Sequence, residues 1–387
     1  MEISNIKKGK VFLGKYKIID EINRGGMGSQ IYLAENLNYN KEDSHFSKKY
    51  KYSAIKFINK TDETTKENWN KILDESVTNA RLTQSDNIVQ LYEMHPLNKD
   101  SIALVMEYVD GPNLKELIRE RGCLPLPEAF SIFKKILIGV IEMHSKDSVI
   151  IHRDLKPENI ILSKDKLDVK IADFGISSVL VENDNFNDYV LTDENSFFGT
   201  IPYVTPDAVY NKSTGNKMGE NSRPIITKQY DFHALGIIFY EMLIGEKPFE
   251  ILDENNQRTI LYWKEFDITP MKFINPNIRN EIENVILRLT ASKDKMMQHR
   301  YYDALEILND INKIEEKIAN KLPEDPTLLP YNERKYQNDI TLQIIGSKKM
   351  NFRQNLRTNI LFITSSFMFF ILIILAITFI ALSASYY

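Results

Sequence analysis

The chain has 387 residues, which is enough for two to three domains of about 150 residues and for a sizeable core. With 43% hydrophobic and 26% charged residues, the composition excludes global disorder. The 49 Lys and Arg residues against 53 Asp and Glu give a formal net charge of -4, so no nucleic-acid partner is indicated. The single cysteine, Cys123, excludes an intramolecular disulfide, and the six histidines show no zinc-binding spacing.

Residues 11 to about 106 predict a small, β-rich lobe with one main helix. Short β-type runs alternate with turns over most of this stretch. A helix is expected over 69–81, because Thr64 and Glu67 have the spacing of a capping box and apolar residues follow at helical intervals. Residues 1–10 are polar and do not form a secretory signal peptide.

A glycine-rich turn, NRGGMGS at residues 23–29, separates two predicted strands in this lobe. Glycines allow backbone N–H groups to approach phosphates without interference from a Cβ atom. Phosphate binding is therefore one interpretation of this turn, and a simple hairpin is the other.

Lys56 is the one charged residue on the apolar strand predicted over 53–58. An unpaired ammonium is costly to bury, so Lys56 requires an anion. Glu75, on the predicted helix, is the natural protein partner, and the α- and β-phosphates of a nucleotide are the natural ligand partner. The alternative is a lysine whose ammonium extends to solvent.

Residues from about 110 to 318 predict a larger, mostly helical lobe with short strands near 160 and 170. Residues 231–243 are apolar nearly all round, which is typical of a helix in the middle of a core. His144 lies on a predicted helix, where we expect it to be a packed core histidine.

Two runs carry the strongest chemical signal: IHRDLKPENIIL at 151–162 and KIADFG at 170–175. Together with GGMGS at 25–29, AIK at 54–56, the pattern GTxxYxxP at 199–206 and DFHALG at 231–236, they resemble the protein kinases, specifically the bacterial eukaryotic-like Ser/Thr family with one membrane span. The resemblance covers about residues 11–318. It implies an α+β, two-lobed kinase fold, with an N-lobe over about 11–106 and a C-lobe over about 110–318, and transfer of the γ-phosphoryl group of ATP to Ser/Thr hydroxyls of protein substrates.

The resemblance also implies roles for the motif residues. Asp154 is expected to accept the proton of the attacking hydroxyl, and Lys156 to contact the transferred phosphate. Lys56, held by Glu75, is expected to orient the α- and β-phosphates. A lysine at position 156 is typical of Ser/Thr specificity, and an exposed loop lysine is the alternative.

ATP and a divalent metal ion are the expected cofactors. Asn159 and Asp173 are expected to bind Mg²⁺ or Mn²⁺ through oxygen atoms. The run LVMEYVDG at 104–111 resembles the hinge between kinase lobes, and its backbone is expected to bind adenine. Met106 is equally well interpreted as a core methionine. The expected ATP site comprises Ile22, Asn23, Arg24, Gly25, Gly26, Met27, Gly28, Ile31, Ala54, Lys56, Met106, Glu107 and Val109.

The family resemblance further implies regulation through the loop between residues 177 and 200. Arg153 occupies a position at which an arginine of this family usually pairs with a phosphorylated loop residue. Thr192 and Ser196 are the expected autophosphorylation sites, and a loop that is held open without phosphate is the alternative. Thr200 is expected beside the catalytic aspartate, in the site that aligns the substrate.

The sequence departs from the family pattern at three positions. Asn23 replaces the first glycine of the turn, which can survive because Asn tolerates positive φ, and Gln30 is one extra residue before the next strand. Asp207 replaces a glutamate and is expected to pair with Arg300. The expected structural residues are Asp207, Asp231 and Arg300. These departures motivate an alternative function, a nucleotide-binding pseudokinase scaffold at the membrane, whereas the complete catalytic and metal-binding set favours an active enzyme.

Residues 358–387 contain no charged residue, and their apolar part is long enough to cross a bilayer that requires about 20 helical residues. We therefore expect a transmembrane helix over 358–384 after a juxtamembrane linker over 319–357; a buried soluble helix is the alternative. Four basic residues precede the helix, Lys348, Lys349, Arg353 and Arg357. They predict a single-pass protein of the cell membrane with a cytoplasmic kinase domain and contacts with lipid; an ordinary solvated face is the alternative for these four residues. Because the sequence stops at Tyr387, shortly after the expected helix, we expect no extracellular sensor. Anchoring raises the local concentration, which favours phosphorylation of one copy by another. The expected partners are protein substrates and a second copy, in a homodimer through the kinase domains.

Overall fold

The computed structural model describes residues 6–24, 30–40, 42, 50–59, 85–145, 149–165, 168–173, 203–205, 228–248, 268–291 and 300–325. All of them belong to one unit of the chain, Met1–Arg334, and the second unit, Lys335–Tyr387, contains none. No helix among the described residues has both the length and the hydropathy needed to cross a bilayer. The helix predicted over 358–384 lies outside them, and so does the helix predicted over 69–81.

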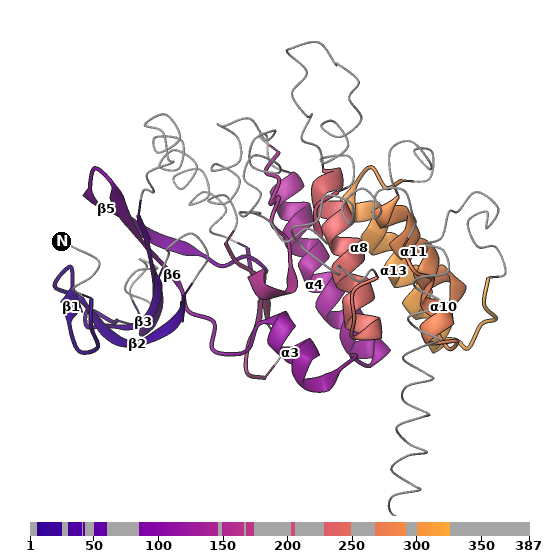
Figure 1. Ribbon diagram of the computed structural model, residues 1–387, viewed down its shortest axis with the longest axis horizontal. Coiled ribbons are helices and arrows are strands. Elements are labelled where there is room, and N and C mark those ends of the chain that lie inside the picture. Colours follow the sequence, from indigo (N-terminus) through magenta and orange to yellow (C-terminus); the bar gives the residue numbers. More distant parts are fainter. Residues whose placement is uncertain are drawn as a thin grey trace, which may run out of the picture. The chain divides into compact units, whose positions relative to one another are not determined.

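The first strands form one six-stranded sheet, which is visibly curled in Figure 1. The strands are β1 (Val11–Phe12), β2 (Tyr16–Arg24), β3 (Gln30–Asn36), β4 (Tyr52–Asn59), β5 (Leu91–Asn98) and β6 (Ser101–Glu107). Their order in the sheet is β1-β2-β3-β4-β6-β5, and all neighbouring pairs are antiparallel. The prediction of a β-rich N-lobe is therefore confirmed.

The two faces of this sheet have different roles. One face carries a cluster of buried apolar side chains: Ile6, Phe12, Tyr16, Ile18, Tyr32, Ala34, Ile55, Phe57, Ala103 and Val105. Side chains alternate between the faces along a strand, and the register pairs Ile31 with Lys56 and Ala54 with Met106. These four residues therefore share the opposite face.

The second lobe is mostly helical. Its elements are α3 (Leu114–Arg121), α4 (Leu126–His144), the 3-10 turn η3 (Pro157–Asn159), the hairpin strands β7 (Ile160–Leu162) and β8 (Val169–Ile171), α8 (Gln229–Ile244), α10 (Met271–Ile274), α11 (Asn280–Thr290) and α13 (Ala304–Ala319). The helical lobe and its two short strands agree with the prediction.

Helix α8 lies in the middle of this lobe, as its apolar sequence predicts (Figure 1). The rings of Phe133 on α4 and Phe239 on α8 stack with centroids 4.2 Å apart. Gly236 allows α11 to come close, because a Cβ atom there would lie 2.6 Å from Thr290 Cγ2. The buried face of α8 thus supports both neighbouring helices.

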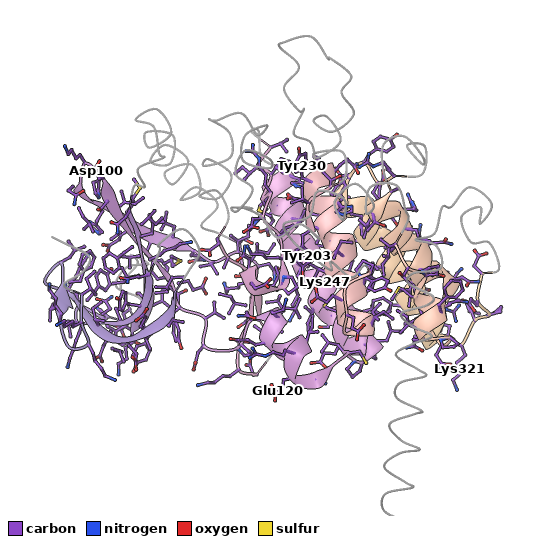
Figure 2. All side chains as sticks on the ribbon, in the orientation of Figure 1. Asp100, Glu120, Tyr203, Tyr230, Lys247 and Lys321 are labelled. Atoms are coloured by element: carbon purple, nitrogen blue, oxygen red, sulfur yellow. The ribbon has the colours of Figure 1, made fainter. Side chains whose placement is uncertain are left out.

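Tyr203 connects the short segment 203–205 to α8. Its hydroxyl donates to Glu241 Oε2 at 2.5 Å, and Lys247 Nζ lies 5.4 Å from the centre of its ring (Figure 2). Burial, and next the negative charge of Glu241, raise the pKa of the Tyr203 hydroxyl above its usual range. The hydroxyl therefore stays protonated and acts as a donor to α8.

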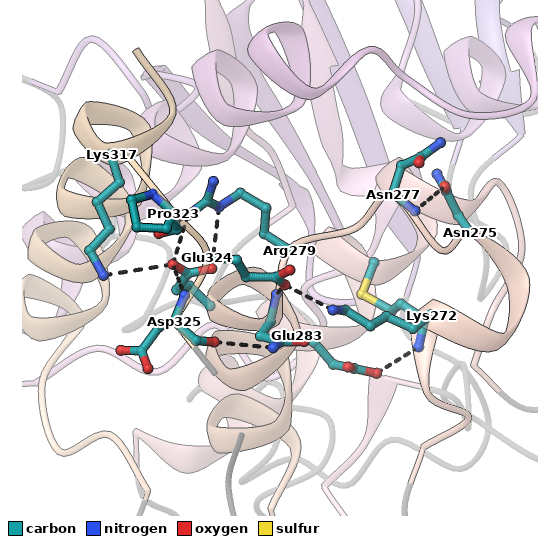
Figure 3. A network of polar contacts seen from close by, with 12 residues as sticks. Lys272, Asn275, Asn277, Arg279, Glu283, Lys317, Pro323, Glu324 and Asp325 are labelled. Atoms are coloured by element: carbon teal, nitrogen blue, oxygen red, sulfur yellow. Dashed lines mark hydrogen bonds and ion pairs between the residues drawn. The ribbon is translucent and has the colours of Figure 1, made fainter. Parts of the chain in front are cut away.

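The chain beyond α13 turns back onto the start of α11. We call residues 322–325 the clasp (Figure 3). The Arg279 guanidinium donates to the carbonyl oxygens of Leu322 and Pro323 at 3.1 and 3.0 Å. Glu324 pairs with Lys272 at 2.8 Å and accepts the first N–H of α11. The folded part of the C-lobe therefore continues past the end of α13.

Candidate active site

An ion pair connects the N-lobe sheet to Asp173, two residues after the end of β8. Lys56 Nζ on β4 lies 2.8 Å from Asp173 Oδ1, and Lys56 is only 8% exposed. Burial by itself would raise the pKa of the Asp173 carboxyl, but the charge and hydrogen bond of Lys56 outweigh it and hold this pKa below its usual range. The anion that a buried Lys56 requires is thus a carboxylate on the other lobe.

Asp154 lies in a cluster of three polar side chains just before β7. Lys156 Nζ donates to Asp154 Oδ2 at 2.7 Å. Asn159 Nδ2 donates to the same oxygen at 3.1 Å and to the carbonyl oxygen of Asp154 at 2.8 Å. The side chains of Asp154 and Lys156 are 25% and 22% exposed, so a substrate hydroxyl can reach them. The hydrogen bonds from Lys156 and Asn159 orient the Asp154 carboxylate, as a general base requires.

Asp231, the third residue of α8, holds the backbone in front of Asp154. Its fully buried carboxylate accepts the N–H groups of His152 at 2.9 Å and of Arg153 at 3.0 Å. Arg153 has φ 65°, a conformation that non-glycine residues rarely adopt. The two hydrogen bonds thus keep the residue before Asp154 in an unfavourable but defined conformation.

His144, at the end of α4, completes this buried group. It is 5% exposed, in agreement with the prediction of a core histidine, and its Nε2 lies 2.8 Å from Asp231 Oδ2. Burial by itself would raise the pKa of Asp231, but the hydrogen bond from His144 and the electrostatic interactions with His144 and His152 hold this pKa below its usual range. No local pattern predicts this pairing, because the two residues are 87 positions apart.

The β7–β8 hairpin brings Asn159 and Asp173 together. Ala172 N–H donates to the Asn159 carbonyl oxygen at 2.8 Å, and His152 Nε2 lies 3.1 Å from the Ala172 carbonyl oxygen. Because the Asn159 amide nitrogen is used by Asp154, its side-chain oxygen is the atom that can bind a metal ion. Asn159 and Asp173 thus offer the oxygen ligands that Mg²⁺ prefers.

The residues expected to contact the nucleotide base lie at and after the end of β6. Ala54 and Met106 are register partners on the face of the sheet that carries Lys56. The N–H of Glu107 donates to the Gln90 carbonyl oxygen at 2.8 Å, so a base contact from the Glu107 backbone has to use its carbonyl oxygen. The backbone hydrogen bonds of the described residues give the Val109 N–H no acceptor, so this N–H can donate to the base.

The departures next to the glycine turn are accommodated by strand pairing. Asn23 pairs with Ile31 and Arg24 with Gln30, and β2 contains register shifts just before these pairs. The extra residue Gln30 is therefore part of β3. Asn23 is a strand residue and is not among the described residues with positive φ, so its tolerance of positive φ is not used at this position. The turn itself, residues 25–29, lies outside the described residues, and its survival stays a prediction. Ile22, another residue of the expected ATP site, lies on β2 and is 45% exposed.

Some expected site residues lie outside the part of the chain that the structure describes. They are Gly25, Gly26, Met27, Gly28, Glu75, Thr192, Ser196, Thr200 and Asp207. Arg300 is described and 6% exposed, and its Nε donates to Gln229 Oε1 at 3.0 Å. Its expected pairing with Asp207 stays a prediction.

Sequence reasoning missed Lys170. Its Nζ lies 2.9 Å from Glu107 Oε1, and both side chains are largely buried. Burial raises the pKa of the Glu107 carboxyl, although Lys170 opposes this shift. An isolated lysine on a three-residue strand offers no indication that it contacts the hinge.

Comparisons with known proteins agree with this geometry. A family model described as protein kinase domain matches residues 43–308. A putative serine/threonine-protein kinase of Mycoplasma genitalium is 36% identical over 351 residues, which cover 87% of this chain and 88% of that protein. Serine/threonine-protein kinase PrkC of Bacillus subtilis is 31% identical over 303 residues, 78% of this chain and 41% of its own length. The crystal structure of the Mycobacterium tuberculosis PknI kinase domain, a point mutant, superposes with a TM-score of 0.54 at 16% identity, over 80% of this chain and 98% of that one, which shows similarity of fold.

Proposed function

This chain belongs to the protein kinase family and is a Ser/Thr protein kinase, and we propose that it transfers the γ-phosphoryl group of ATP to Ser/Thr hydroxyls at the membrane. The proposal of phosphoryl transfer rests on two clusters of side chains. One is the pair Lys56 and Asp173. The other is Asp154 with Lys156 and Asn159. Together the two clusters offer a base, two cations and two oxygen ligands on neighbouring elements.

Phosphoryl transfer has a loose transition state with its charge spread over the phosphate oxygens, so catalysis depends on alignment and electrostatic stabilisation. Asp154 accepts the proton of the attacking hydroxyl and aims it. Lys156, 2.7 Å from Asp154, is close enough to contact the phosphoryl group as it moves to that hydroxyl. Lys56 holds the phosphates of the nucleotide. A Mg²⁺ ion held by Asn159 and Asp173 would neutralise charge on the phosphate oxygens when bound.

The base of the nucleotide would contact the end of β6 and the residues after it. Ala54 and Met106 supply an apolar surface on the face of the sheet that also carries Lys56. The Glu107 carbonyl oxygen and the Val109 N–H offer one acceptor and one donor. Adenine carries a donor beside an acceptor on its Watson–Crick edge, which matches this pair.

Replacement of Lys56 by Ala in the full chain tests the nucleotide assignment. Calorimetric titration with ATP and Mg²⁺ should show weaker binding by at least about tenfold, because a buried charge-assisted contact is lost. Transfer of labelled phosphate to a generic basic protein substrate should fall in parallel. Unchanged binding and transfer would contradict the role of Lys56.

We further propose that residues 358–384 anchor the chain in the cell membrane and that the kinase domain is cytoplasmic. The uncharged sequence and the basic residues before it support this orientation. The full chain should sediment with membranes, resist high-salt extraction and dissolve in detergent. A protease added outside intact cells should leave the kinase domain uncut; its cleavage would reverse the orientation.

Autophosphorylation in trans is the proposed mode of regulation. Confinement to a membrane raises the effective concentration of a second copy, and phosphate on Thr192 or Ser196 could pair with Arg153. Mass spectrometry after incubation with ATP should find phosphate on one of these residues in the wild type and not in Asp154→Asn. An active preparation without phosphate on either residue would contradict this mode.

A further inference from the structure

The β7–β8 hairpin carries the two metal-binding candidates at one end and contacts the hinge at the other. β7 begins directly after Asn159, and β8 ends two residues before Asp173. At the far end, Leu162 N–H donates to the Pro112 carbonyl oxygen at 3.0 Å. A Cβ atom on Gly111 would lie 2.1 Å from the Leu162 carbonyl oxygen, so the two backbones are in direct contact.

Two acid–base pairs reinforce this contact, and they differ in burial. Lys170 on β8 pairs with Glu107 at 2.9 Å, and their side chains are 11% and 15% exposed. Lys164, in the turn of the hairpin, pairs with Asp110 at 2.7 Å, and their side chains are 75% and 55% exposed. Solvent screens the second pair, whereas loss of one partner from the first leaves a desolvated charge.

Ile171, the neighbour of Lys170 on β8, pairs with the segment 85–90 that leads into β5. Ile171 N–H donates to the Asn87 carbonyl oxygen at 2.9 Å, and Val89 N–H donates to the Ile171 carbonyl oxygen at 2.9 Å. The other carboxylate oxygen of Glu107 accepts the Gln90 N–H at 3.2 Å. Glu107 therefore joins the hinge, the segment 85–90 that leads into β5 and, through Lys170, the hairpin.

We propose that Lys170 is a positioning residue: through Glu107 it fixes the hairpin to the hinge and thereby sets the spacing between the base-binding backbone and the metal ligands. The inference rests on the proposed binding of nucleotide and metal by this site. Each strand of the hairpin has only three residues, about 10 Å, so a displacement at the hinge is passed to Asn159 and Asp173 almost undiminished.

The test compares Lys170→Met with Lys164→Met in the full chain. Both changes remove an ammonium from the same hairpin and keep a long apolar stem. The readouts are kcat and the Mg²⁺ concentration that gives half-maximal activity at saturating ATP. Lys170→Met should lower kcat by about fivefold or more and raise the half-maximal Mg²⁺ concentration by about threefold or more, because small errors in alignment are costly in phosphoryl transfer. Lys164→Met should leave both values unchanged.

A double-mutant cycle separates positioning from a general loss of stability. Glu107→Gln, Lys170→Met and the double variant should give similar kinetic defects if the lysine acts through Glu107. The double variant removes both buried charges and is expected to fold. The proposal is overturned if Lys170→Met matches Lys164→Met in both readouts, if the two single defects multiply, or if only the melting temperature changes. A wild-type chain that fails to bind Mg²⁺–ADP in calorimetry would instead overturn the proposed function on which the inference rests.

Discussion

Replacement of Asp231 by Asn tests the support of the catalytic loop with a nearly isosteric change. The carboxylate accepts the Arg153 N–H through Oδ1 and the His152 N–H through Oδ2, which also faces His144 Nε2. An asparagine side chain has one acceptor oxygen, so its NH₂ group must face at least one of these donors. A buried backbone donor is then left without an acceptor.

The expected cost follows from the number of hydrogen bonds that Asn cannot make. A hydrogen bond to a charged group contributes about 1.5–3 kcal/mol, so the loss of one or two gives about 2–5 kcal/mol in the free energy of unfolding. For a domain of this size, that corresponds to a fall of roughly 4–10 °C in Tm. Because Arg153 directly precedes Asp154, we also expect kcat to fall by about 100-fold.

Thermal unfolding of the full chain measures the fall in Tm, and a phosphotransfer assay measures the fall in kcat. Asp303→Asn is the matched control, because Asp303 caps α13 by accepting the Leu305 N–H at 2.8 Å and Asn is an equally good cap. The Asp231 pKa is lowered in the folded state, so its stabilisation is complete above its unfolded pKa of about 4 and is lost as the pH falls through the folded pKa. The difference in stability between wild type and Asp231→Asn should therefore shrink in acid. Equal Tm and kcat for Asp231→Asn and Asp303→Asn would refute the proposal that Asp231 holds the backbone in front of Asp154.

Three further changes test other contacts. Gly111→Ala should lower Tm by several degrees and weaken ATP binding, because its Cβ would lie 2.1 Å from the Leu162 carbonyl oxygen; a wild-type melting curve and ATP affinity would show that the hinge does not need this close approach. Glu324→Ala should speed hydrogen exchange in the clasp by about tenfold, with the exposed Lys313→Ala as its control, and equal exchange in both variants would contradict the clasp. Tyr203→Phe should cost about 1–3 kcal/mol in unfolding free energy, because Glu241 is then buried without its donor; a change below about 0.5 kcal/mol would argue against that bond.

The sequence predicted the features that depend on local patterns. Alternation and apolar runs indicated the β-rich lobe, the two short strands and the buried helix, because each signal lies within a few residues of the element that it describes. The burial of Lys56 on an apolar strand also indicated that an anion had to be close. The ordered motifs indicated the kinase fold.

Pairings between distant residues were not predictable from these patterns. Asp173 lies 117 positions after Lys56, and periodicity cannot select it over other carboxylates. The expected partner, Glu75, lies outside the described residues, so that pairing stays a prediction. Periodicity likewise does not predict the contacts of His144 with Asp231, of Lys170 with Glu107 and of the clasp with α11. These contacts depend on how the chain folds back on itself, which a single sequence does not encode as a local signal.

Phosphate transfer by this site depends on the carboxylate of Asp154, and Asp154→Asn removes that carboxylate with little change in size. The measurement is transfer of labelled phosphate from ATP to a protein substrate by the full chain, beside calorimetric binding of Mg²⁺–ATP to the same preparations. Asn keeps the shape of the side chain and the bond from Lys156 but accepts protons poorly, so we expect transfer to fall by roughly 10²–10⁴-fold with nearly unchanged binding. Transfer at the wild-type rate in Asp154→Asn would show that Asp154 is not the base, and nucleotide binding without transfer by the wild type would favour the scaffold function.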